Sequence, residues 1–146
     1  MIKPLIALGI VLLPVAAASA EEFAATNAYV TETKAWPITT KDGYWMVRFE
    51  GVSQVTKGPI ETMAVECNGA GFWGAEGIVG NGICVHGSGE DTFILRWDAD
   101  GPSRTWEILS GTGKYATLTG SGTATTKKLA GNRRISKLAG TVNLAD

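Results

Sequence analysis

Short runs of alternating apolar and polar residues, separated by turn-forming residues, fill most of this chain. In the clearest run, Thr92–Asp98, the residues Phe93, Leu95 and Trp97 occupy every second position. The run Tyr44–Gly51 shows the same alternation. Side chains alternate between the two faces of a β-strand, so each run predicts a strand with one buried face. Helical periodicity is nearly absent after residue 20, and we therefore predict an all-β fold.

The turn signals between these runs divide residues 21–146 into about eight or nine strands. Strands are predicted at Tyr29–Thr33, Tyr44–Gly51, Ile60–Cys67, Phe72–Val79, Ile83–His86, Thr92–Asp98, Arg104–Leu109, Ala116–Thr126 and Arg134–Leu144. Residues 21–28 are predicted to be a mobile lead-in, and Gly80-Asn81-Gly82 a turn. This spacing fits a β-sandwich or a closed antiparallel barrel of about eight strands, and periodicity alone does not separate the two. No linker or change in composition indicates a second domain.

The first twenty residues have the pattern of a cleaved signal peptide. Lys3 supplies the positive charge, an apolar stretch follows, and Ala18-Ser19-Ala20 fits the rule of small residues at the cleavage site. The apolar stretch is shorter than the roughly 20 residues that a membrane anchor requires. We therefore expect residues 1–20 to be removed and residues 21–146 to form one periplasmic or secreted domain.

Charge argues against some partners of this domain. Once Lys3 is removed with the signal peptide, acidic residues slightly outnumber basic ones. Nucleic acids and anionic membranes select a concentrated basic surface, so neither is an expected partner. One basic cluster, Lys127-Lys128 with Arg133-Arg134, stands near the C-terminus. We interpret it as the solvated flank of a hairpin, with an anion-contact patch as the alternative.

The two cysteines, Cys67 and Cys84, predict one disulfide in an exported protein. The glycine-rich segment between them suggests a loop or a bulged region. A metal site is the rival interpretation, but His86 is the only histidine and a convincing fourth ligand is missing. The absence of a Cys-x-x-Cys motif argues against a redox role. We expect no metal and no cofactor.

The most specific motif is Ser110-Gly111-Thr112-Gly113-Lys114-Tyr115, followed by a strand that contains Gly120 and Gly122. We expect the first two glycines to permit a tight turn or bulge and Tyr115 to fix that turn on the end of the barrel. A phosphate-binding P-loop is excluded, because the sequence lacks Gly-Lys-Ser/Thr and a following helix.

This motif, with Trp106 just before it, resembles the glycine-threonine-glycine-x-aromatic signature of the allene oxide cyclase and dirigent barrel superfamily. The resemblance covers about residues 103–124 and points to an uncharacterised bacterial exported branch. It implies an eight-stranded antiparallel barrel with an interior cavity, often in an oligomer. It assigns no catalytic residue.

Candidate chemistry is sparse. His86 is the natural acid–base candidate, and Glu66 is a second one. The simpler interpretation of His86 is a surface histidine or one close to a turn. Arg96 and Asp98 share a strand face, which we expect to point outward because the opposite face is more apolar.

Five tryptophans are many for a chain of this length, and four of them are candidate ligand-binding residues: Trp36, Trp45, Trp73 and Trp97. Packing of the barrel interior is the alternative, especially for Trp45 and Trp97. The leading hypothesis is an exported barrel that binds an apolar or aromatic small molecule, or a partner protein. The alternatives are a cavity-type cyclase or isomerase, and a structural protein that acts through a homo-oligomer.

Overall fold

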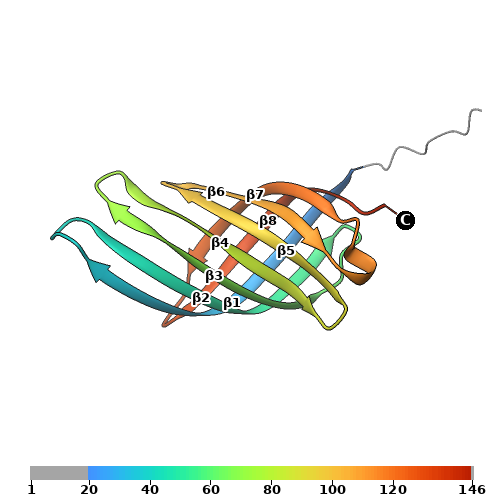
Figure 1. Cartoon of the computed structure of the whole chain (residues 1–146), viewed down its shortest axis with the longest axis horizontal. Coiled ribbons are helices and arrows are strands. Elements are labelled where there is room, and N and C mark those ends of the chain that lie inside the picture. Colours follow the sequence, from blue (N-terminus) through green and yellow to red (C-terminus); the bar gives the residue numbers. More distant parts are fainter. Residues whose placement is uncertain (1–19, 146) are drawn as a thin grey trace, which may run out of the picture.

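The computed structural model describes residues 20–145 as a closed barrel of eight antiparallel strands (Figure 1). Each strand pairs with its neighbours in sequence, and β1 closes the barrel against β8. The strands are β1 (Glu21–Pro37), β2 (Gly43–Lys57), β3 (Met63–Gly74), β4 (Gly77–Ser88), β5 (Asp91–Asp100), β6 (Ser103–Gly111), β7 (Thr119–Lys128) and β8 (Arg133–Asn143), with one short 3-10 helix, η1 (Gly113–Tyr115). The predicted antiparallel barrel is confirmed. The predicted signal peptide lies outside the described residues, except for Ala20.

Inward-facing residues follow the period of two that the sequence predicted. On β2 the inner positions include Trp45, Val47 and Phe49, and on β5 they include Phe93 and Leu95. The outward pair Arg96 and Asp98 forms an exposed ion pair, as expected.

Three sequence-based boundaries are wrong. The strand predicted at Phe72–Val79 is interrupted by the β3–β4 turn, because β3 ends at Gly74 and β4 begins at Gly77. Residues 21–28 are not a lead-in, because they form the first half of β1 and pair with β8 from Glu21 onward. Gly80-Asn81-Gly82 is not a turn, since these residues lie inside β4 and pair with β3. The segment between the cysteines is therefore not a loop. It is the β3–β4 hairpin, and Cys67 stands directly opposite Cys84, to which it is disulfide-bonded.

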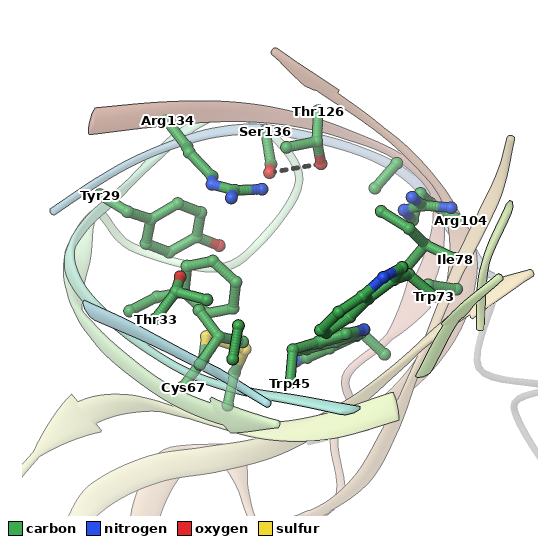
Figure 2. Close-up of a pocket in the computed structure, with 17 residues that line it drawn as sticks. Tyr29, Thr33, Trp45, Cys67, Trp73, Ile78, Arg104, Thr126, Arg134 and Ser136 are labelled. Carbon is green, nitrogen blue, oxygen red and sulfur yellow. Dashed lines mark hydrogen bonds between the residues drawn. A yellow bond between two sulfur atoms is a disulfide. The ribbon is translucent and has the colours of Figure 1, made fainter. Parts of the chain in front are cut away.

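The glycines of β3 and β4 make room for indole rings inside the barrel. A Cβ on Gly82 would lie 2.5 Å from Cζ2 of Trp97, and a Cβ on Gly80 would lie 2.6 Å from Cζ2 of Trp45. Both residues line the cavity of the barrel, and Figure 2 shows the ring of Trp45 inside it. Side chains at these two positions would collide with the rings, so the glycines are required by packing and not by a turn.

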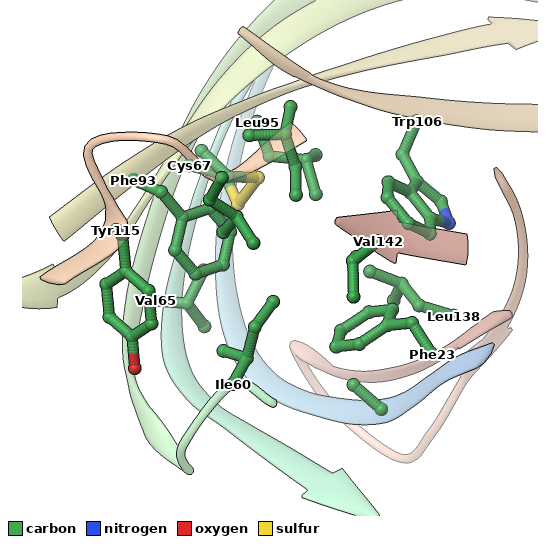
Figure 3. Packing of buried hydrophobic residues seen from close by; sticks show 14 residues of the cluster. Phe23, Ile60, Val65, Cys67, Phe93, Leu95, Trp106, Tyr115, Leu138 and Val142 are labelled. Atoms are coloured by element: carbon green, nitrogen blue, oxygen red, sulfur yellow. A yellow bond between two sulfur atoms is a disulfide. The ribbon is translucent and has the colours of Figure 1, made fainter. Parts of the chain in front are cut away.

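The interior is filled at one end of the barrel and hollow at the other. The filled end is a cluster of apolar residues from nearly all strands (Figure 3). Tyr115 of η1 is buried there, and its hydroxyl accepts a hydrogen bond from the backbone N–H of Glu61 at 3.3 Å. Lys114 binds the Glu61 carboxylate at 2.6 Å. The glycine-containing motif therefore fixes the β6–β7 connection on the end of the barrel, as its sequence suggested.

The turn in this motif depends on Gly113, which has a φ of +54°. The backbone N–H of Lys114 then donates to Asp91 at 3.0 Å, and the hydroxyl of Thr112 donates to the carbonyl of Glu90 at 2.6 Å. A side chain at Gly113 would be strained and would also collide with Asp91.

His86 belongs to the filled end, and its interpretation as a surface histidine is wrong. It shares the inner face of β4 with Cys84, is only 2% exposed, and stacks on Phe93 with ring centroids 4.5 Å apart. Neither ring nitrogen has a hydrogen-bond partner within residues 20–145. Burial lowers the pKa of His86 to about 3, so the imidazole is neutral at ordinary pH.

We expect Gly82→Ala to destabilise the barrel by about 1–3 kcal/mol, because the methyl group would collide with the backbone carbonyl of Asn68 and with the ring of Trp97. Urea unfolding measures this cost. Asn81→Ala is the matched control, because Asn81 is the exposed neighbour on the same strand and its replacement should change stability by less than about 0.5 kcal/mol. Equal effects of the two substitutions would contradict this packing role of glycine.

We also expect His86 to make the fold sensitive to acid. Its pKa is about 3 in the folded chain and about 6.5 in the unfolded chain, so below pH 6.5 the unfolded state takes up a proton that the folded state excludes. The contribution of His86 to the free energy of unfolding is therefore fully present above pH 6.5 and is lost as the pH drops toward 3. The loss attributable to His86 is about 2–3 kcal/mol between pH 7 and pH 4.5.

The measurement is urea unfolding at pH 7 and pH 4.5 for the wild type and for His86→Phe. Phenylalanine keeps an aromatic ring against Phe93 but does not titrate. Between pH 7 and pH 4.5, the free energy of unfolding of the variant should therefore fall by about 2–3 kcal/mol less than that of the wild type. The carboxylates titrate in both proteins, so their effect cancels. The same pH dependence in both proteins would show that burial of His86 carries no such cost.

Candidate functional site

A cavity of about 360 Å³ occupies the open half of the barrel. Its volume lies near the lower end of the range for pockets that hold small organic ligands. All strands of the barrel contribute to its wall: Tyr29, Thr33, Ala35, Trp45, Val47, Phe49, Cys67, Trp73, Ile78, Cys84, Trp97, Ala99, Arg104, Ala124, Thr126, Arg134 and Ser136. The disulfide belongs both to this lining and to the apolar cluster of the filled end, so it lies where the cavity meets the core.

One side of the cavity is an aromatic wall. Trp45 reaches from β2 and Trp97 from β5, and both rings lie over the glycines of the β3–β4 hairpin. Their planes are within 10° of parallel and their centroids are 6.3 Å apart. This separation is close to the two-residue repeat along a strand, so the rings lie side by side along the hairpin. Phe49 meets Trp97 edge to face, and Trp73 extends the wall toward the open end.

This wall also carries two polar atoms that have no partner. The indole N–H groups of Trp45 and Trp97 are buried and form no hydrogen bond within the described part of the chain. Buried donors in proteins are nearly always satisfied, by protein or by water.

The other side of the cavity is polar and is formed by β1, β7 and β8. The hydroxyls of Thr126 and Ser136 bond to each other at 2.8 Å. Tyr29 accepts a hydrogen bond from the side-chain amide of Asn27 at 2.6 Å, which leaves its own O–H free to donate. Burial raises the pKa of Tyr29 to about 12, so this phenol keeps its proton at ordinary pH. Figure 2 shows Arg134 pointing into the cavity on this same side.

The two arginines of the cavity differ in how they are held. Arg104 donates to the carbonyls of Gly101 and Ser103, both at 2.6 Å, and is therefore fixed to the β5–β6 turn. The guanidinium of Arg134 makes no hydrogen bond or ion pair within residues 20–145. No aspartate or glutamate belongs to the cavity lining described here.

The sequence-predicted site residues fall into two groups. Trp45, Trp73 and Trp97 line the cavity. Glu66 and Trp36 do not: Glu66 is exposed on the outside of β3 in an ion pair with Arg48, and Trp36 is 46% exposed against Tyr44. His86 is also absent from the lining. A role for these three residues in catalysis or recognition stays a prediction.

Sequence reasoning missed the polar side of the cavity. Tyr29, Thr126 and Ser136 were not candidates, because threonine, serine and tyrosine in strands are common without any function. Arg134 had a weak signal in the basic cluster Lys127-Lys128 and Arg133-Arg134. The structure divides that cluster, since the lysines and Arg133 are exposed on the hairpin while Arg134 alone lines the cavity.

The described residues contain neither a metal-binding cluster nor a membrane-spanning helix. No group of three or more His, Cys, Asp or Glu side chains in residues 20–145 could hold a metal ion. In the same part of the chain, no helix combines the length and the apolar character needed to cross a membrane.

Comparison with known proteins identifies relatives of the fold only. No family model matches the sequence, and neither does any curated protein sequence. Among solved structures, the pterocarpan synthase dirigent protein GePTS1 matches with a TM-score of 0.53 and 14% identity, over 96% of this chain and 97% of that chain. Pyocyanin demethylase matches with a TM-score of 0.46 and 16% identity, over 77% of this chain and 97% of that one. The likeness to GePTS1 shows that this chain has the barrel fold of a dirigent protein.

Proposed function

We propose that this protein binds a flat apolar or aromatic small molecule in its barrel cavity. The observation that carries the proposal is the aromatic wall: Trp45, Trp73 and Trp97 line one side of a space of ligand size. Large side chains usually fill the interior of a small barrel. Here the rings of Trp45 and Trp97 pack directly on the glycine backbone of β3 and β4, and this close packing leaves the centre of the barrel open.

Export to the periplasm or outside the cell is part of the same proposal. It rests on the signal-peptide pattern of residues 1–20 and on the disulfide, which is typical of oxidising compartments. β1 begins at Glu21, so cleavage after Ala20 would leave the strand and its pairing with β8 complete.

A cyclase or isomerase that works inside the cavity is the second candidate. It is favoured by the phenol of Tyr29 and the guanidinium of Arg134, two hydrogen-bond donors that line the polar side opposite the aromatic wall. Donors held in this way could stabilise negative charge that develops on a substrate oxygen. The name of the similar dirigent protein, a pterocarpan synthase, is compatible with such a role.

Binding is testable with N-phenyl-1-naphthylamine, a neutral aromatic probe whose fluorescence rises in apolar surroundings. We expect the probe to brighten on addition of the protein and to quench tryptophan emission. Trp45→Leu and Trp97→Leu should each weaken probe binding about tenfold, because each removes about 1–1.5 kcal/mol of aromatic contact.

Trp36→Leu is the matched control, since this indole lies outside the cavity, and it should leave probe affinity unchanged. Thermal unfolding of each variant separates lost binding from lost folding. A wild type that neither brightens the probe nor gains thermal stability from it would overturn the proposed cavity function. Equal losses in Trp36→Leu and Trp97→Leu would place the probe elsewhere.

A further inference from the structure

The cavity is electrostatically one-sided. It contains two guanidinium groups, from Arg104 and Arg134, and its lining includes no carboxylate. The acidic residues that form ion pairs in the described chain bind lysines and arginines outside the cavity, as Glu50 and Glu66 bind Arg48, and as Asp98 and Glu107 bind Arg96. A cavity with positive charge, apolar walls and no internal counterion attracts anions.

Arg134 is the group that most needs a partner. The side chain of Arg104 is already satisfied by two backbone carbonyls, whereas the side chain of Arg134 binds no group within residues 20–145 and reaches into the cavity (Figure 2). The guanidinium group presents a planar set of donors that matches the two oxygens of an oxyanion. The hydroxyl of Tyr29, on the same side, has a free hydrogen to add to such a contact.

From this arrangement we infer that the ligand is an aromatic or conjugated molecule with one acidic oxyanion group, such as a carboxylate or a sulfonate. Its flat part lies against Trp45 and Trp97, and its oxyanion lies at Arg134. The inference rests on the proposed binding function and adds the charge of the ligand and the residue that recognises it.

The aromatic wall and Arg134 lie on different sides of the cavity, so a ligand must have both a flat aromatic part and an oxyanion to contact both. An inorganic anion would leave the aromatic wall without contact, and a neutral hydrocarbon would leave the half-buried guanidinium of Arg134 without an anionic partner. A ligand that carries an oxyanion gains a charge contact there that a neutral ligand does not make.

The test uses two probes that differ by a single sulfonate group. 8-Anilino-1-naphthalenesulfonate carries a sulfonate on the ring system of N-phenyl-1-naphthylamine, so the pair isolates the oxyanion. We expect the wild type to bind the sulfonate probe at least about tenfold more tightly than the neutral probe, in line with a hydrogen-bonded charge contact. Fluorescence titration of both probes against the full chain, at fixed ionic strength, provides the two dissociation constants.

Arg134→Gln should remove this preference by weakening sulfonate binding about tenfold while leaving the neutral probe unchanged. Arg133→Gln is the matched control: it changes the net charge equally, but Arg133 is exposed on the neighbouring position of β8. It should leave both affinities as they are. Arg134→Lys keeps the charge but not the planar set of donors, so it should retain part of the preference; binding of the neutral probe by each variant shows that the variant is folded.

The outcomes separate the two proposals. If both probes bind the wild type equally and Arg134→Gln changes neither, the cavity binds apolar molecules but the oxyanion inference is wrong. Equal losses in Arg133→Gln and Arg134→Gln would also overturn the inference, because they would reflect net charge alone. If neither probe binds, the proposed binding function fails with it.

Discussion

The structure depends on the packing of indole rings against glycine backbone. Trp45 and Trp97 lie over β3 and β4, where any Cβ on Gly80 or Gly82 would collide with them. Because the glycines have no side chains, the indole rings occupy the space that side chains of β3 and β4 would otherwise fill. A barrel of eight strands has an interior just wide enough for side chains, so moving two large ones against the wall decides whether space remains. Here about 360 Å³ remains.

A cavity of this kind needs one end of the barrel to be firmly closed. The motif around Gly113 provides the closure, because it places Tyr115 in the core and joins η1 to the β2–β3 connection through Glu61. The motif connects β6 and β7, and these two strands are paired at only three positions. Trp106 strengthens their pairing, because its indole N–H donates to the carbonyl of Thr123 at 3.0 Å.

The proposed binding function rests on aromatic and polar residues that line different sides of one space. β2, β3 and β5 supply the rings, and β1, β7 and β8 supply hydroxyl groups and Arg134. Closure of the barrel brings β7 and β8 to the same cavity as β2 and β3, although these strands are distant in sequence. His86 has no part in this division, because it is neutral, buried and stacked on Phe93 in the filled end.

The sequence by itself determined the all-β class, the inner faces of the clearest strands, the disulfide and the closing turn. These follow from local causes: the period of two in Phe93, Leu95 and Trp97, and the turn chemistry at Gly113. The tertiary structure alone decided what the glycines and the charges do. Gly80 and Gly82 read as a turn because their partner, an indole ring, comes from another strand. The sequence placed Arg134 in a surface cluster. Alternation along a strand assigns a residue to one face, but only closure of the barrel decides which face borders the cavity.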